Sequence, residues 1–240
     1  MLRRFYLEPK QIYRDKFHIT DDQIRHIRNV LRMNPGDQIE IVNGQGDLYT
    51  GEITKTSKEF IAGKILDKEH FFNDDVTVTI AQALGKSDKF EEVIDSVSQL
   101  GIHGIIPLET EYCIKKAGNI QKKQVRWNKI NVSAFKQSRS LFMMNIYPVM
   151  KFNELKENFT DFDLIIALHP ASKKSIHEVE KKLTSAKNIL IIIGPEGGLS
   201  PKEVRSIGDD NLYNLSGNIL KTETTPVVIV SVIEYLLKKL

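Results

Sequence analysis

The chain has 240 residues, a length that fits one or two domains, and 41% of its residues are hydrophobic and 27% charged, as in ordinary globular proteins. Its single cysteine, Cys113, excludes an internal disulfide and a zinc site built from several cysteines. No apolar run reaches the roughly 18 residues of a membrane-spanning helix, and charged residues follow the N-terminus closely, unlike in a signal peptide. We therefore expect a cytoplasmic protein that does not enter a membrane.

Positive charge is concentrated in two stretches of the chain. The net charge is only +3, but residues 1–35 contain eight Lys and Arg against four Asp and Glu. Residues 112–153 contain nine Lys and Arg and no acidic residue. Two basic stretches in an otherwise acidic chain favour a polyanionic partner. The alternative is a solvated helix face whose charges are neutralised by acidic residues that are close only in space.

A helix is predicted near the N-terminus. Residues 20–23 have the form of a capping box, in which a glutamine side chain returns to the amide of the cap residue. Behind them Ile24, Ile27, Val30 and Leu31 have helical spacing and should form one apolar stripe. Three basic residues lie on a different stripe and should be exposed, namely Arg25, Arg28 and Arg32.

The remainder of the first seventy residues has the pattern of a small β-barrel. Short strands are predicted at residues 38–42, 48–53 and 60–66, with glycine-containing turns between them. Such short, turn-separated strands are typical of small barrels. Residues 67–75 are polar and are predicted to be a linker, so the first domain should span residues 1–70.

The second part of the chain alternates strands and helices. Its buried strands should be near-continuous apolar runs, and its helices should show helical periodicity. Strands are predicted at residues 76–80, 102–107, 163–168 and 188–193, and helices at residues 90–100, 123–140 and 226–239. This alternation indicates an α/β domain with a parallel sheet over residues 74–240.

The most specific motif is the glycine-rich segment at residues 194–203, Gly-Pro-Glu-Gly-Gly-Leu-Ser-Pro-Lys-Glu, directly after a predicted buried strand. Ligands of open α/β folds bind at this edge of the sheet. Ser200 and Glu203 form a second capping box, with Pro201 at the first helical position. The segment lacks a phosphate-binding lysine, and Glu196 would repel phosphates, so a ligand with an adenine, a ribose and a positive centre fits better than a nucleoside triphosphate. The alternative is a simple turn.

A second segment, residues 215–225, also follows a predicted strand and precedes a helix. Its Thr-Glu-Thr at residues 222–224 could be ordinary helix capping by Thr222 or Thr224. Taken alone, this segment favours the capping interpretation.

Together, the two segments resemble the RsmE family of ribosomal RNA methyltransferases, in which Gly-Pro-Glu-Gly-Gly-Leu-Ser is followed by Ile-Leu-x-Thr-Glu-Thr. The resemblance spans nearly the whole chain, although Asn218 and Lys221 stand where family members often carry Arg. It implies a trefoil-knotted α/β domain of the SPOUT class at residues 74–240 and a PUA-like RNA-binding β-barrel at residues 1–70.

The resemblance also implies an activity: methyl transfer from S-adenosylmethionine to N3 of a uridine in 16S ribosomal RNA, by a homodimer. The cofactor would be held by three loops and a nearby threonine, comprising Leu168, His169, Pro170, Gly194, Pro195, Glu196, Gly197, Gly198, Leu215, Ser216, Asn218, Ile219, Leu220 and Thr224. No metal is expected, because a sulfonium already activates the methyl group and no His pair has ligand spacing.

The uridine must present an unpaired N3 and lose its proton, and nearby cations would stabilise the resulting anion. Arg139 and Lys221 are the candidates for this role. The residues expected to hold RNA are basic, namely Arg3, Arg4, Arg25, Arg28, Arg32, Lys86 and Arg126.

Two other interpretations stay open at this point. One is a non-catalytic RNA-binding module of ribosome assembly that retains the knot fold. The other is a small-molecule enzyme with a nucleotide cofactor and no affinity for RNA.

Overall fold

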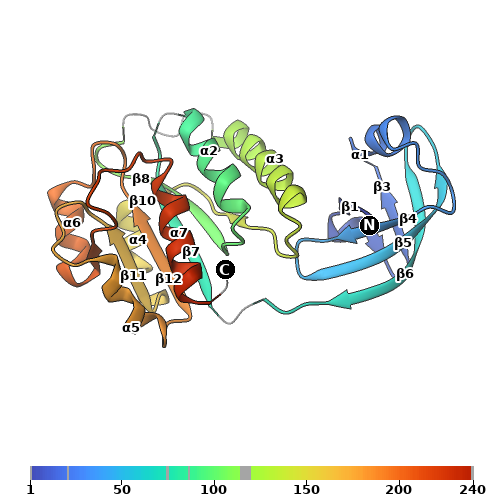
Figure 1. Ribbon diagram of the computed structural model, residues 1–240. Coiled ribbons are helices and arrows are strands. Elements are labelled where there is room, and N and C mark those ends of the chain that lie inside the picture. Colours follow the sequence, from blue (N-terminus) through green and yellow to red (C-terminus); the bar gives the residue numbers. More distant parts are fainter. Residues whose placement is uncertain (1, 21, 74–75, 86, 114–119, 239–240) are drawn as a thin grey trace. The chain divides into compact units, whose positions relative to one another are not determined.

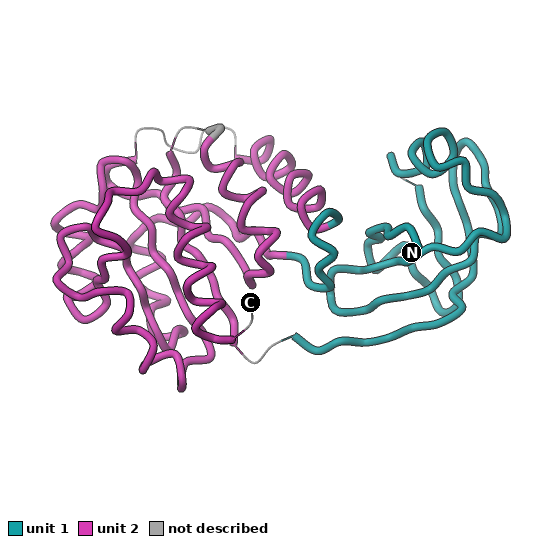
Figure 2. Tube along the Cα trace, in the orientation of Figure 1, with its two compact units in different colours: residues 1–73, 136–143 teal, residues 74–135, 144–240 magenta. Residues whose placement is uncertain are grey.

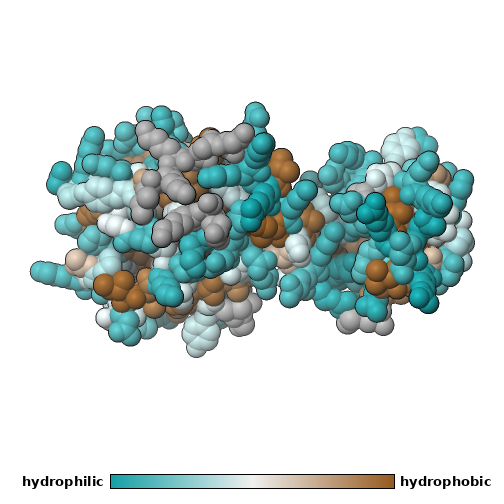
Figure 3. All heavy atoms as spheres, turned by 90° about the horizontal axis from the view of Figure 1, so that it is seen from above, coloured by the Kyte–Doolittle hydropathy of each residue, from teal (hydrophilic) through white to brown (hydrophobic). Residues whose placement is uncertain are grey.

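The computed structural model describes residues 2–20, 22–73, 76–85, 87–113 and 120–238 (Figure 1). The chain divides into two compact units, residues 1–73 with 136–143 and residues 74–135 with 144–240 (Figure 2). On the face seen in Figure 3, hydrophilic side chains cover most of the surface of each unit, with small apolar patches between them. None of the described helices is both long and apolar enough to cross a membrane.

The first unit is built on one six-stranded sheet. Its strands, in spatial order, are β1 (Arg3–Tyr6), β4 (Gln38–Val42), β5 (Asp47–Thr56), β6 (Ile61–His70), β3 (Lys16–Ile19) and β2 (Ile12–Tyr13). β1 and β4 pair in parallel, and the other neighbours are antiparallel. Alternate residues of the strands, such as Phe5, Phe17, Ile39 and Ile61, fill one buried core. This small β unit is the one predicted for the N-terminal part.

Residues 67–70 are strand rather than linker, because β6 pairs with β5 as far as His70. A polar cluster closes this end of the hairpin. The Asp47 carboxylate accepts hydrogen bonds from Asn43 Nδ2 at 2.8 Å and from the Tyr49 hydroxyl at 3.0 Å. It also pairs with Lys68 Nζ at 3.2 Å and with His70 Nδ1 at 2.7 Å. Side-chain hydrogen bonds and ion pairs therefore extend β6 to His70. Such polar contacts produce no alternation of apolar and polar residues, so the sequence pattern did not predict this part of the strand.

The predicted N-terminal helix is shorter and wider than expected. α1 (Gln23–Arg25) begins three residues beyond Thr20, and the Gln23 amide donates to the Tyr6 carbonyl at 2.9 Å. The helix continues as a π-helical turn (His26–Val30), in which the Leu31 amide donates to the carbonyl five residues earlier. This wider turn rotates Val30 out of the apolar stripe, and Val30 is 66% exposed while Ile27 is fully buried. The prediction that Val30 lies on the buried stripe was wrong.

Residues 136–143, predicted as part of the second domain, pack with the first unit. The Gly46 amide donates to the Leu141 carbonyl, and the Met143 amide donates to the Gly44 carbonyl, both at 3.0 Å. Arg4 Nη1 donates to the Arg139 carbonyl at 2.6 Å. Contacts between segments so distant in sequence leave no local pattern that a sequence analysis could detect.

The second unit is an α/β domain with a parallel sheet, as predicted. Its strands, in spatial order, are β10 (Met150–Lys151), β8 (Gly104–Glu109), β7 (Thr77–Ala83), β12 (Asn188–Ile193), β11 (Leu164–Leu168) and β13 (Leu212–Tyr213), and β9 (Asn145–Ile146) also pairs with β8. Every strand pair of this sheet is parallel. The trefoil knot stays a prediction.

Helices cover both faces of this sheet. The helices on one face are α2 (Ser87–Ser98), α3 (Ile120–Ser138), α5 (Glu180–Leu183) and α7 (Thr225–Leu236), and those on the other are α4 (Phe152–Glu157) and α6 (Pro201–Ile207) (Figure 1). Trp127 of α3 is 2% exposed and packs against Phe90 of α2, with 4.7 Å between ring centroids. Trp127 therefore anchors the core of this unit.

The polar cluster of the first unit gives a prediction for stability. Burial alone would raise the pKa of Asp47, but hydrogen bonds from His70, Lys68 and Tyr49 outweigh it and hold the pKa below its ordinary value. We expect Asp47→Asn to destabilise the first unit by about 1–3 kcal/mol at pH 7, because it weakens bonds to a nearly buried carboxylate. Urea-dependent hydrogen exchange of the first-unit amides measures this loss.

The pH dependence has a defined sign. Because the pKa of Asp47 is lower in the folded state, the carboxylate stabilises the unit above its unfolded value, near 4. This contribution shrinks as the pH falls below the unfolded value and is lost as it passes through the lower folded value, so wild type and variant should converge only below the folded pKa. Asp67→Asn, which removes an exposed carboxylate from the neighbouring strand β6, is the matched control and should leave exchange unchanged. Equal losses in the two variants would contradict the role of Asp47.

Candidate active site

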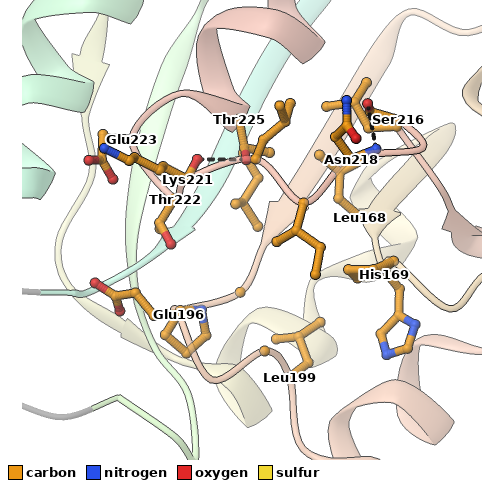
Figure 4. Close-up of a pocket in the computed structure, with 18 of the residues that line it drawn as sticks. Leu168, His169, Glu196, Leu199, Ser216, Asn218, Lys221, Thr222, Glu223 and Thr225 are labelled. Atoms are coloured by element: carbon orange, nitrogen blue, oxygen red, sulfur yellow. Dashed lines mark hydrogen bonds between the residues drawn. The ribbon is translucent and has the colours of Figure 1, made fainter.

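Three loops of the second unit enclose one cavity of about 670 Å³ at the carboxyl end of the parallel sheet (Figure 4). They follow β11, β12 and β13, and they are the three loops that the sequence analysis singled out. Most of the residues predicted in those loops line the cavity, namely Leu168, His169, Pro170, Gly194, Pro195, Glu196, Gly198, Leu215, Ser216, Asn218, Ile219 and Leu220. Lys221 lines it as well, whereas Gly197 and Thr224, although predicted, are outside the lining.

The loop after β12 is compact because glycine allows its two sides to approach closely. A Cβ atom on Gly194 would lie 3.2 Å from both the Gly198 carbonyl carbon and the Leu199 amide nitrogen. Gly198 has φ of +75°, in the left-handed region that favours glycine, and its amide donates to the Pro195 carbonyl at 2.8 Å. The loop is therefore a tight turn whose backbone faces the cavity.

The far end of this loop is fixed by the predicted capping box at the start of α6. The Ser200 amide donates to Glu203 Oε2 at 2.8 Å, and the Glu203 amide donates to Ser200 Oγ at 3.3 Å. The second carboxylate oxygen of Glu203 accepts the Glu111 amide at 2.9 Å. Glu203 is buried, and it joins the loop both to its own helix and to the segment that follows β8.

The loop after β13 is held by short-range hydrogen bonds. The Ser216 amide donates to Asn214 Oδ1, and the Asn218 amide donates to Ser216 Oγ, both at 3.1 Å (Figure 4). Near its end the Lys221 carbonyl accepts the Thr225 hydroxyl at 2.9 Å. Thr224 occupies the N-cap position of α7 but makes no side-chain capping bond, so the capping interpretation fails for this residue.

An ion pair joins this loop to α2. Lys89 Nζ lies 2.8 Å from Glu223 and 3.1 Å from Glu92. The hydrogen bond from Lys89 holds the pKa of Glu223 below its ordinary value, and the bonds to Glu223 and Glu92 raise the pKa of Lys89. Glu223 is therefore an ionised carboxylate beside the cavity. The sequence analysis noticed Glu223 only as part of Thr-Glu-Thr and missed Lys89, which is close only in space.

The cavity has chemically different sides. In the view of Figure 4, Glu196, Thr222 and Glu223 lie on one side, whereas Leu168 and His169 lie on the other. The carboxylate of Glu196 lies beside the backbone just after β7. A Cβ atom placed on Gly85 would be only 3.2 Å from its Oε1. Apolar walls, backbone donors and acceptors, and two carboxylates favour a ligand with a flat apolar ring, hydroxyl groups and positive charge over a phosphorylated one.

The predicted RNA-binding residues are distributed over both units. Arg126 pairs with Glu91 at 2.6 Å and Arg4 pairs with Glu40 at 2.9 Å, so spatially close acids neutralise these two cations. The others that are described are exposed or, for Arg28, half-buried, namely Arg3, Arg25, Arg28 and Arg32. Lys86 lies outside the described residues. Arg139, predicted to be catalytic, belongs to the first unit and lines a different cavity, so that role stays a prediction.

Comparison with known proteins identifies the family. Residues 73–234 match a family model described as an RNA methyltransferase domain, and residues 19–66 match an RNA methyltransferase PUA domain. Over 247 residues the chain is 30% identical to the ribosomal RNA small subunit methyltransferase E of Bacillus subtilis, covering 98% of this chain and 96% of that one.

Solved structures agree with this assignment. A putative methyltransferase from Legionella pneumophila, solved with bound S-adenosylmethionine, is 25% identical, with a TM-score of 0.85 and 98% of each chain covered. The small subunit methyltransferase E of Neisseria gonorrhoeae has the same fold, at 24% identity, with a TM-score of 0.86 and 98% of each chain covered. The chain therefore belongs to the RNA methyltransferase family of the ribosomal RNA small subunit methyltransferase E proteins.

Proposed function

We propose that the protein transfers a methyl group from S-adenosylmethionine to N3 of a uridine in 16S ribosomal RNA. The observation that carries this proposal is the single cavity formed by all three predicted loops in a member of this family. An intact cavity of this kind favours an enzyme over a non-catalytic assembly module. The RNA methyltransferase and PUA family models likewise argue against a small-molecule enzyme.

The cavity fits the chemistry of the cofactor. Leu168, Ile193 and Leu199 supply an apolar wall suited to adenine, and the loop backbones supply hydrogen-bonding groups for the ribose and the amino acid part. Glu196 and Glu223 place negative charge where a sulfonium is favourable and a phosphate is not. Bound here, S-adenosylmethionine would supply a methyl group that its sulfonium already activates.

The role of this chain is then to orient the uridine and to support the loss of its N3 proton. Lys221 is an exposed cation at the cavity and is our candidate for stabilising the uridine anion. Glu223, kept ionised by Lys89, fixes the loop that carries Lys221. The predicted homodimer and cytoplasmic location belong to this proposal, and light scattering tests the dimer.

The activity is tested directly with purified protein, S-adenosylmethionine and small ribosomal subunits. Mass-spectrometric mapping should find one new N3-methyluridine in 16S RNA and none in large-subunit RNA incubated in parallel. Cells that lack the gene should lack the same modification. A modification that persists in those cells would refute the assigned substrate.

The tight turn after β12 predicts the effect of a single methyl group. We expect Gly194→Ala to weaken S-adenosylmethionine binding at least tenfold, about 1.4 kcal/mol, because the new Cβ atom would crowd the backbone across the turn. Isothermal titration calorimetry measures the affinity, and thermal unfolding checks the fold. Gly217→Ala, where a Cβ atom has open space, is the matched control and should bind as wild type. Normal binding by Gly194→Ala would argue against this turn as the cofactor loop.

The Lys89–Glu223 ion pair predicts a pH effect. Removing Lys89 lets the pKa of Glu223 rise toward its ordinary value, so in Lys89→Ala the acidic limit of cofactor binding should move to higher pH. At pH 7, where Glu223 is ionised in both proteins, we expect affinity to fall roughly fivefold, because the loop loses its tie to α2. Calorimetry between pH 4 and pH 7 measures both effects. Lys156→Ala, on α4 of the other sheet face, is the control, and a profile shared by the two variants would contradict the role of the pair.

A further inference from the structure

The first unit has a cavity of its own, of about 570 Å³, lined only by residues of that unit. Its walls come from β1, from α1 with the π-helical turn that follows it, and from residues 136–139. This volume is within the range of pockets that hold small molecules, roughly 300–1,000 Å³. The cavity shares no lining residue with the cavity of the three loops, and the transfer reaction itself gives it no role.

The walls of this cavity are fixed by Arg4. Its guanidinium pairs with Glu40 at 2.9 Å and donates to the Arg139 carbonyl at 2.6 Å, so it ties β1 to the end of α3. Only 14% of the Arg4 side chain is exposed. Arg139 has φ of +60°, which turns the chain out of the helix at this point. The backbone of Arg139 is thus held while its side chain stays exposed at the cavity.

Two arginines that line the cavity, Arg3 and Arg139, have guanidinium groups without an acidic partner among the described residues. Among the described residues, neither Arg3 nor Arg139 forms a side-chain ion pair, and both side chains are exposed. A guanidinium fork matches the oxygens of a phosphate better than any other side chain. These two arginines therefore provide an anion-binding pair at a site whose third arginine is already neutralised.

Two further lining residues, Leu31 and Asp22, suit a nucleobase rather than a bare anion. Leu31 is half-buried and supplies an apolar contact for a flat ring. Asp22 is exposed and makes no side-chain cap on α1, so its carboxylate is available to accept N–H groups of a base. A carboxylate would repel the ligand in a site that bound only inorganic anions. Cations for a phosphate, an apolar contact for a ring and a carboxylate for N–H groups together fit a nucleotide.

We propose that this cavity binds one unpaired nucleotide of the RNA substrate, with Arg3 and Arg139 on its phosphate and Asp22 on the hydrogen-bonding edge of its base. The RNA identity of the ligand rests on the proposed function. Single-stranded RNA is recognised through bases splayed out of the helix, which is the form this cavity can accept. Arg139 then acts in substrate positioning, and the catalytic role predicted for it is unnecessary.

The test compares two doubly substituted full-length proteins with equal loss of charge. Arg3→Gln with Arg139→Gln removes both forks from the cavity, and Lys16→Gln with Lys58→Gln removes two exposed cations of the first unit outside it. Fluorescence anisotropy measures affinity for a labelled single-stranded RNA across salt concentrations. We expect the arginine variant to bind at least tenfold more weakly, with a salt slope about 1.4 smaller for two lost phosphate contacts, and the lysine variant to change less than twofold. Equal affinities of the two variants would overturn the proposal.

Asp22→Asn separates base recognition from plain electrostatics. If Asp22 accepts N–H groups of a base, the variant should bind RNA more weakly although it has lost a negative charge. Tighter RNA binding would overturn the assignment of the base to this side chain. Competition with uridine monophosphate, guanosine monophosphate and inorganic phosphate distinguishes the sources, because displacement of the RNA by any of them at micromolar concentration would identify a free small-molecule ligand instead.

These measurements do not depend on methyl transfer. A wild-type protein that methylates no RNA, together with weaker RNA binding by the arginine variant, would refute the proposed function and leave the cavity assignment intact. Normal methylation together with unchanged RNA binding by that variant would refute the cavity assignment and leave the proposed function intact. Calorimetric binding of S-adenosylmethionine should be equal in wild type and both double variants, which shows that the second unit is undisturbed.

Discussion

The buried carboxylate of Glu203 is the interaction on which the candidate active site depends. A loop built of glycine and proline has few side chains with which to hold its own shape. Glu203 supplies that support from outside the loop, since one oxygen accepts the Ser200 amide and the other the Glu111 amide. Hydrogen bonds to a charged group contribute about 1.5–3 kcal/mol each, enough to keep a short turn in one conformation. The segment after β8 is drawn to the loop by the same group, so that Tyr112 lies close to Gly197.

The same arrangement makes the loop unsuited to a phosphorylated ligand. Its backbone is already committed to a tight turn, and the only ionisable side chain within it is the Glu196 carboxylate. On the same side of the cavity as Glu196, Glu223 is kept ionised by Lys89, whose own charge is paired with two carboxylates. The ammonium group of Lys89 therefore fixes the loop through its ion pairs and is not available to bind a ligand. A ligand in this cavity therefore meets an apolar wall and two carboxylates, with Lys221 as the exposed cation.

Local patterns in the sequence predicted those features that depend on local interactions. The apolar runs of β11 and β12 identified the parallel sheet, and Ser200 with Glu203 identified the start of α6, because both signals lie within a few residues. The π-helical turn was missed because it has the same composition as an α-helical one, and only the hydrogen bond of Leu31 distinguishes it. The packing of residues 136–143 and the position of Lys89 were missed because their partners are distant in sequence, 135 residues away for Arg4 and Arg139.

Charge counting along the chain identified basic stretches but could not separate cations available to RNA from cations already in use. Residues 112–153 contain no acid, yet Arg126 pairs with Glu91 from another helix. Arg4 is similarly neutralised by Glu40, and its role is to hold the backbone of Arg139. Attraction of a polyanion then depends on the arginines that the fold leaves unpaired, and Arg3 and Arg139 are two of these beside one cavity. On the proposals made above, a cavity with unpaired guanidinium groups would favour the nucleic acid, and one bordered by carboxylates would favour the cationic methyl donor, so the sign of the charge helps to separate the two.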